Sequence, residues 1–241
     1  MKFLEKLSAK AADKTGKAPV TIAFLGDSVT QGCFEVYETG NGGLDTVYEP
    51  ESGYPAKTVS ILHQFCPGAQ INTIPAGISG DSAPGGLARL ERDVLRYSPD
   101  LTVVSFLLND SCGGTERISV YTDALRQIFA RLQDAGSEVI FMPSNPMCRS
   151  VSPHIRQELF RNLAPGFIRL MKDGVVDAYA EAGRKTAEEC GVPVCDCYGS
   201  WNAMHQHGID TTALLSNQLN HPTREMHWMF AWELIHTMLH N

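Results

Sequence analysis

Residues 20–30 read VTIAFLGDSVT, and this stretch decides the fold of the chain. Residues 20–25 are mostly apolar, are rich in β-branched side chains and lie between Pro19 and Gly26, so they predict a strand buried on both faces. Such strands belong to parallel sheets that helices cover. The polar turn Asp27-Ser28 follows at once, at the edge of the sheet where ligands bind.

Strands and helices alternate along the rest of the chain. Apolar runs predict four more strands, at residues 71–74, 101–107, 139–142 and 192–195. Apolar residues at helical spacing predict helices at 54–65, 87–97, 118–135 and 226–238, and a longer helical region at about 153–190. Five strands separated by helices predict right-handed crossovers and a parallel sheet. We expect one domain over residues 1–241, with residues 1–17 as an N-terminal helix or loose extension.

Composition and charge restrict the classes of partner. The net charge of -7 argues against nucleic acid and anionic membranes, because both require a basic face. No run of about 18 apolar residues predicts a membrane-spanning helix. Residues 1–17 lack the apolar stretch of a secretory signal, so we expect a cytoplasmic protein. The sequence gives no indication of oligomeric state.

Cysteine and histidine spacing does not favour a metal site. The seven cysteines are odd in number and form no CxxC pair, which is typical of reduced thiols. Cys195-x-Cys197 and His205-x-His207 are weak metal motifs without further ligands at suitable spacing. A strand end with small buried side chains and an exposed loop are the favoured interpretations. We expect no metal and no organic cofactor.

Polar residues suited to acyl transfer follow the predicted strands. Ser28, Gly77 and Asn109 come two or three residues after the first three strands, so they should meet at one edge of the sheet. A serine nucleophile needs a base, and His221 is well placed because Pro222 holds it in an extended conformation at a helix entrance. The Gly77 N–H and the Asn109 amide are suitable donors to an oxyanion. Taken singly, these residues also suit a turn, a cap and a packed histidine.

Together these residues resemble the SGNH-hydrolase, or GDSL-esterase, superfamily. The matching blocks, in the order found in that superfamily, are Gly26-Asp27-Ser28, the run AGISG at residues 76–80, Asn109-Asp110 and His221-Pro222. The resemblance implies a flavodoxin-like three-layer α/β/α sandwich with a five-stranded parallel sheet, and ester hydrolysis through an acyl-enzyme. It implies Ser28 as nucleophile, His221 as base, and an oxyanion hole of Ser28, Gly77 and Asn109.

A second Gly-Asp-Ser, ending at Ser82, is a rival for the nucleophile. It follows a glycine-rich turn rather than a long buried strand, and it overlaps the second block. We therefore favour Ser28.

The chain departs from the superfamily beside its histidine. Gln218 stands where an aspartate usually precedes the histidine by three residues, and no carboxylate lies between Asp210 and Glu225. Three interpretations remain: a Ser–His dyad oriented by Gln218 or by a carbonyl of this loop, an Asp210 that folds back to the histidine, or a weak or inactive esterase.

The substrate class is less defined than the reaction. We expect a soluble small-molecule ester, with a short-chain or acetyl ester on a carbohydrate as first choice. A lysophospholipase or thioesterase is the alternative enzyme, and a non-catalytic carbohydrate- or acyl-binding relative is the alternative from another class. Residues 32–53, glycine-rich and aromatic, are interpreted as a substrate lid or rim, or else as a surface loop or dimer contact.

Overall fold

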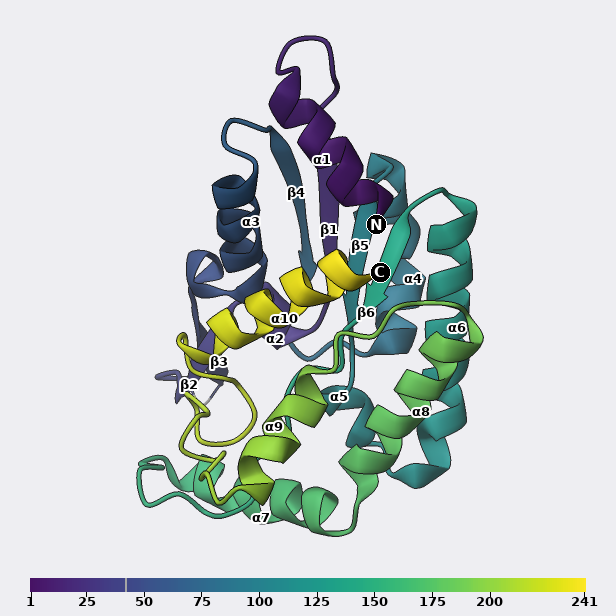
Figure 1. Ribbon diagram of the computed structural model, residues 1–241. Helices are drawn as coiled ribbons and strands as arrows, with labels where there is room; N and C mark the ends of the chain where they lie inside the picture. The colour runs from purple at the N-terminus through teal and green to yellow at the C-terminus, as the bar shows by residue number, and fades with distance from the viewer. Residues whose placement is uncertain (42) are drawn as a thin grey trace.

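The structure is a computed structural model that describes residues 1–41 and 43–241. Its centre is a parallel sheet of β1 (Val20–Gly26), β4 (Ile71–Gly77), β5 (Leu101–Ser105) and β6 (Glu138–Phe141), in the order β4-β1-β5-β6. The chain moves outward from β1 to β4, crosses to β5 on the other side and continues to β6 (Figure 1). The carboxyl ends of all four strands therefore meet at one edge of the sheet.

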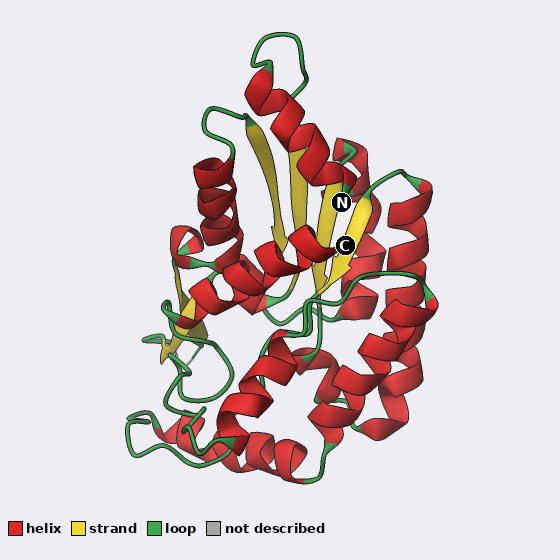
Figure 2. Ribbon diagram, in the orientation of Figure 1, coloured by secondary structure: helices red, strands yellow, loops and turns green. Residues whose placement is uncertain are grey.

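Helices cover both faces of the sheet (Figure 2). In Figure 1, α1, α3 and α10 lie on the near face, and α4 with α6 on the far face. The helices are α1 (Lys2–Ala12), α2 (Ser28–Gln31), α3 (Tyr54–Phe65), α4 (Ala83–Asp93), α5 (Leu108–Ser111), α6 (Ile118–Asp134), α7 (Glu158–Lys172), α8 (Val175–Glu189), α9 (Cys197–Gln206) and α10 (Met226–His240), with 3₁₀ turns η1 (Pro50–Ser52), η2 (Leu95–Tyr97) and η3 (Thr115–Arg117). The α/β class, with helices on both faces of a parallel sheet, is confirmed.

The core forms because the central strands are apolar on both sides. Ile22, Phe24 and Val103 are 0% exposed. Truncation of one such side chain to alanine typically costs about 2–5 kcal/mol of stability. The strands are thereby rigid supports for the loops at their carboxyl ends.

The fifth strand, expected at residues 192–195, is reduced to one parallel bridge between Val194 and Phe141. Pro193 has no N–H with which to extend a ladder, and α9 begins at Cys197. The described sheet therefore has four strands, which leaves the fold class unchanged.

The segment at residues 32–53 is more regular than the expected loop. It contains an antiparallel pair, β2 (Cys33–Glu38) and β3 (Leu44–Tyr48), called the hairpin below. Gly42, which the predicted rim includes, lies outside the described residues. Glycines and acidic residues obscured the strand signal here.

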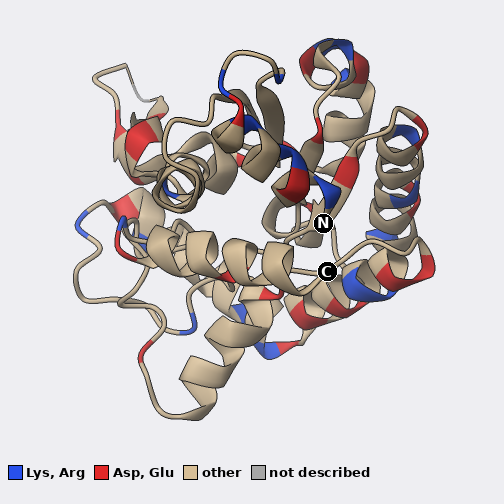
Figure 3. Ribbon diagram, turned by 45° about the horizontal axis from the view of Figure 1, so that its top comes forward, with Lys and Arg blue, Asp and Glu red and all other residues tan. Residues whose placement is uncertain are grey.

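Most charged positions lie on helices and loops, whereas Glu35, Glu38, Asp45 and Glu138 lie on strands. Figure 3 shows Lys and Arg positions mixed with Asp and Glu positions on several of the helices. Among the described residues, no helix combines the length and apolar character needed to cross a membrane.

Candidate active site

Ser28 is held at the end of β1 by a tight turn. The Asp27 carboxylate accepts a hydrogen bond from the Val29 N–H at 2.9 Å and so caps α2, whose first residue is Ser28. Gly26 allows the turn to pack closely, because a Cβ there would lie 2.7 Å from the Ser105 carbonyl oxygen. Ser28 is 5% exposed. The side chain is thus fixed and nearly enclosed.

His221 lies between Ser28 and a backbone carbonyl. Its Nε2 is 2.9 Å from Ser28 Oγ, and its Nδ1 is 2.7 Å from the carbonyl oxygen of Phe34, in β2. A carbonyl only accepts hydrogen bonds, so we assign the ring proton to Nδ1, which leaves Nε2 free to accept from the serine hydroxyl. The histidine is therefore in the tautomer that a general base needs.

Burial favours the neutral imidazole. It lowers the pKa of His221 below the usual value, while the Phe34 carbonyl and the nearby Glu35 carboxylate oppose this shift. The loop itself is fixed by Asn217, whose Oδ1 accepts the backbone N–H groups of Leu219, Asn220 and His221. The imidazole of His221 is thus held in position, and its lowered pKa favours the uncharged form near neutral pH.

Gln218 does not orient His221, and this expectation is corrected. Its backbone has a φ of 59° and its Nε2 donates to the Leu215 carbonyl at 2.7 Å, so its amide turns back into its own loop. Asp210 does not fold back either, because its carboxylate accepts the N–H of Thr212. The orienting acceptor is a neutral carbonyl, as one interpretation held, but it comes from the hairpin rather than from the histidine loop.

A cavity of about 510 Å³ opens over Ser28, His221 and Asn109. The Asn109 amide donates to the Asp81 carbonyl at 2.8 Å, which fixes its orientation and leaves its second N–H for another acceptor. The structure therefore brings three sequence-predicted residues to one cavity.

Gly77 does not line this cavity, and Gly80 of the same block does. The Ile78 N–H donates to Gly26, so even-numbered donors of β4 face β1. By the alternation of a strand, Gly77 faces the outer edge together with Pro75, which has no N–H. Gly80 has a φ of 78°, in the left-handed region that suits glycine. The structure therefore leaves Gly77, the expected backbone donor, off the cavity and makes the Gly80 N–H the candidate for that role.

Two further walls complete the cavity. The hairpin supplies a mixed rim, and α7 supplies an apolar wall that sequence reasoning missed. Their lining residues are Cys33, Val36, Leu44, Asp45, Thr46 and Tyr48 from the hairpin, and Phe160, Leu163 and Phe167 from α7. The spacing of the three apolar residues along α7 was the available signal, since positions three, four and seven apart share one helix face.

Ser82, the rival serine, lies elsewhere. It precedes α4 and lines a separate small hollow with Asp110 and Tyr179, rather than the cavity over His221.

Burial raises the pKa of Asp27 and the pKa of Asp110 to about 7 each, so two proton-binding carboxyls lie under the strand ends.

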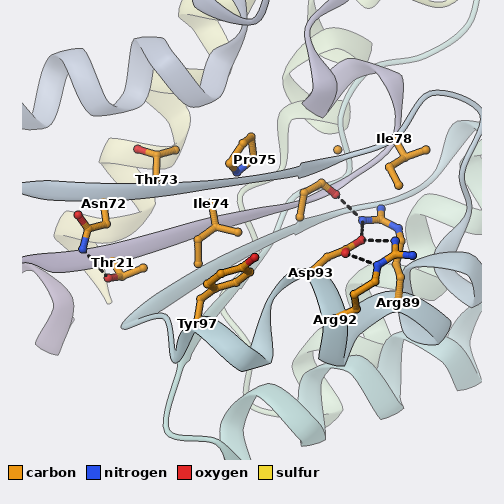
Figure 4. A pocket seen from close by; sticks show the side chains of 12 residues that line it. Thr21, Asn72, Thr73, Ile74, Pro75, Ile78, Arg89, Arg92, Asp93 and Tyr97 are labelled. Carbon is orange, nitrogen blue, oxygen red and sulfur yellow. Dashed lines mark hydrogen bonds and ion pairs between the residues drawn. The ribbon is translucent and has the colours of Figure 1, made fainter.

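A larger hollow, of about 810 Å³, runs along the outer edge of β4 (Figure 4). Figure 4 shows Asp93 paired with Arg89 and Arg92 at one end, and the Tyr97 ring beside Ile74. Its lining contains no serine or histidine. The edge hollow therefore lacks the serine and histidine that line the smaller cavity over Ser28.

The described residues contain no group of three or more His, Cys, Asp or Glu side chains arranged to hold a metal ion. Cys195 and Cys197 lie with their sulfurs 3.6 Å apart in the interior.

Two curated proteins are similar to part of this chain. An acetylxylan esterase of Geobacillus stearothermophilus is 32% identical over 89 residues, which span 37% of this chain and 39% of that protein. An arylesterase of Vibrio mimicus is 32% identical over 75 residues, 31% of this chain and 37% of that protein. Both alignments thus span less than two fifths of these relatives.

Solved structures resemble the whole fold. A catalytic mutant of an acetylxylan esterase from Geobacillus stearothermophilus superposes with a TM-score of 0.65 at 20% identity, covering 92% of this chain and 95% of that chain. Another acetyl xylan esterase gives 0.66 at 18% identity, covering 90% and 98%. At these identities the likeness establishes the fold. The model of the GDSL-like Lipase/Acylhydrolase family matches residues 24–229, most of the chain, and the protein therefore belongs to that family.

Proposed function

We propose that the protein is a serine hydrolase of carboxylic esters that works through an acyl-enzyme on Ser28. The observation that carries this proposal is the hydrogen-bonded chain from Ser28 through His221 to the Phe34 carbonyl. In the first step Ser28 Oγ attacks the ester carbonyl carbon while His221 Nε2 takes its proton. The same proton passes to the leaving alcohol, and water then deacylates the serine with His221 again as base.

The oxyanion of each tetrahedral intermediate is bound by the Asn109 amide and by the backbone N–H groups of Ser28 and Gly80. This set is supported by the placement of all three residues on one cavity. The dyad lacks a carboxylate on Nδ1, so the imidazolium formed during attack is stabilised less than in a Ser-His-Asp triad. We expect catalysis by oxyanion binding to contribute much of the rate.

The proposed substrate is a short-chain ester, with an acetyl group on a carbohydrate as first choice. The polar groups on the mixed rim of the hairpin, Asp45 and Thr46, and the relatives named as acetylxylan esterase and arylesterase support this choice. The apolar wall of α7 favours the second candidate, a lysophospholipase or thioesterase with a longer acyl chain. The protein is proposed to act as one domain, without a metal or an organic cofactor.

Labelling with a fluorophosphonate probe tests the nucleophile. Wild type and Ser82→Ala should label, whereas Ser28→Ala should not. Persistent labelling of Ser28→Ala would show that the nucleophile is misassigned, and absence of labelling in wild type would favour a binding protein.

A series of p-nitrophenyl esters from acetate to octanoate tests the substrate class. Highest kcat/KM on acetate or butyrate supports the short-chain proposal. A maximum of kcat/KM at octanoate would contradict it and favour a lipid or thioester substrate.

A further inference from the structure

The hydrogen bond from His221 to Phe34 joins two segments that are 187 residues apart in sequence. Interactions between sequence neighbours cannot set the geometry of this bond. Tertiary contacts must therefore hold the hairpin against the histidine loop. In Figure 1 the hairpin lies beside the start of α10, which follows that loop directly. Residues 222–225 connect His221 to α10.

Arg224 bridges these same two segments. Its Nη1 and Nη2 donate to the Glu35 carboxylate at 2.8 and 3.0 Å, and its Nε and Nη2 donate to the Glu49 carboxylate at 2.7 Å each. Both pairs are bidentate, the geometry in which a guanidinium fixes orientation as well as distance. Glu35 lies within β2 and Glu49 follows β3 directly, so both are near the open end of the hairpin, where Cys33 pairs with Tyr48.

The Phe34 side chain is held by the same segment. The Arg224 guanidinium lies 4.4 Å from the centre of the Phe34 ring, and the His227 ring lies 5.1 Å from it on α10. Phe34 therefore contacts residues at 221, 224 and 227 through its carbonyl and its ring. Its backbone cannot move away from His221 without breaking these contacts.

We propose that Arg224 is a positioning residue that, with Glu35 and Glu49, holds the Phe34 carbonyl on His221 Nδ1 in place of the missing aspartate. This inference rests on the proposed function of Ser28 and His221. Arg224, Glu35 and Glu49 do not line the catalytic cavity, so they act on the reaction through His221 alone. The three residues are called the clamp below.

The clamp also controls charge beside the imidazole. Its two carboxylates and one guanidinium leave a net negative charge, and Glu35, the nearer carboxylate, favours the imidazolium that forms during attack. Side chains exposed by 31–43% contribute little stability as ion pairs, because solvent screens their charges. The conformation of Phe34, rather than the stability of the fold, should therefore depend on the clamp.

The first test separates kcat from KM. Arg224→Gln should lower kcat roughly 10²-fold, the cost of a small misplacement of a catalytic group, with KM for p-nitrophenyl acetate nearly unchanged. Arg224→Lys should recover part of kcat, because lysine keeps the charge but cannot form the bidentate pairs. Glu38→Gln on the same strand is the matched control and should retain wild-type kcat.

The second test uses the pH profile of kcat/KM, whose acid side reports the protonation of His221. The groups that face His221 are Ser28 from α2, Glu35 from β2 and His227 from α10, with Arg224 and Lys57 beyond them. Arg224→Gln leaves Glu35 unpaired and should move this limb to higher pH. Glu35→Gln removes the negative charge and should move it to lower pH.

These outcomes also separate the clamp from the proposed function. A wild type that never reacts with a fluorophosphonate overturns both. If wild type reacts but Arg224→Gln reacts at the same rate, or raises KM alone, only the clamp is overturned. Shifts of the acid limb in the same direction for Arg224→Gln and Glu35→Gln likewise contradict it. Should Arg224→Gln fail to fold, Arg224→Lys and Glu35→Gln carry the test.

Discussion

At the scale of residues, the site depends on a backbone atom. The Phe34 carbonyl fixes the tautomer of His221 as an aspartate would, but it carries no full charge to stabilise the imidazolium. The carboxylate of the neighbouring Glu35 supplies a negative charge near the imidazole instead, and this charge opposes the lowering of the His221 pKa. The proposed mechanism therefore depends strongly on the donors that bind the oxyanion.

Asn109→Ala is expected to lower kcat about 10²–10³-fold with little change in KM, because its amide binds an oxyanion that exists only in the transition state. Steady-state kinetics on p-nitrophenyl acetate measures this effect. Asn72→Ala, an amide on the remote edge hollow, is the control. A rise in KM without loss of kcat would show that Asn109 binds the substrate instead.

At the scale of elements, the hairpin and α7 both line the cavity. The hairpin brings the carbonyl that orients His221 and a rim with polar groups. Helix α7 brings an apolar face, although Pro165 interrupts its backbone hydrogen bonding. The acyl group of the substrate should therefore contact α7.

Leu163→Ser is expected to reduce the preference for butyrate over acetate by roughly fivefold, since about 1 kcal/mol of apolar contact is lost. The ratio of kcat/KM for the two p-nitrophenyl esters measures this. Leu159→Ser is a close control, because Leu159 is 39% exposed against 40% for Leu163, but it does not line the cavity. Equal changes in both variants would place the acyl group away from α7.

At the scale of the whole molecule, the carboxyl edge of the sheet contains buried acids. Burial raises the pKa of Asp110 from 3.8 to about 7, and Asp27 and Asp81 nearby add to the shift. A raised pKa in the folded state means that the folded protein binds the proton more tightly than the unfolded chain. The stability that this proton gives is present below pH 4 and is lost as the pH rises through 7.

Asp110→Asn should therefore make the free energy of unfolding fall less between pH 4 and pH 7, with proton release on unfolding reduced by up to about one proton. Urea denaturation at several pH values measures this slope. Asp134→Asn, an exposed position on α6, should leave the slope as in wild type. An unchanged slope in Asp110→Asn would mean that Asp110 is ionised in the folded protein at pH 5.

The sequence by itself predicted the features that local pattern encodes. Apolar runs gave the four sheet strands, helical spacing gave α3 with its observed bounds, and the polar turns after β1 and β5 gave Ser28 and Asn109. His221 was predicted from Pro222, which follows it, and from the resemblance of the four sequence blocks to the SGNH-hydrolase superfamily. These predictions needed only neighbouring residues, because strand burial, helix faces and turns are set within a few positions of the chain.

Only the tertiary structure decided what completes the site. Every residue has a carbonyl, so no sequence pattern could single out that of Phe34, and the choice between Gly77 and Gly80 required the register of β4 on β1. The wall from α7 and the clamp at Arg224 also join segments far apart in the chain. The physical reason is the same in each case: these groups acquire their role from the segments that the fold packs against them.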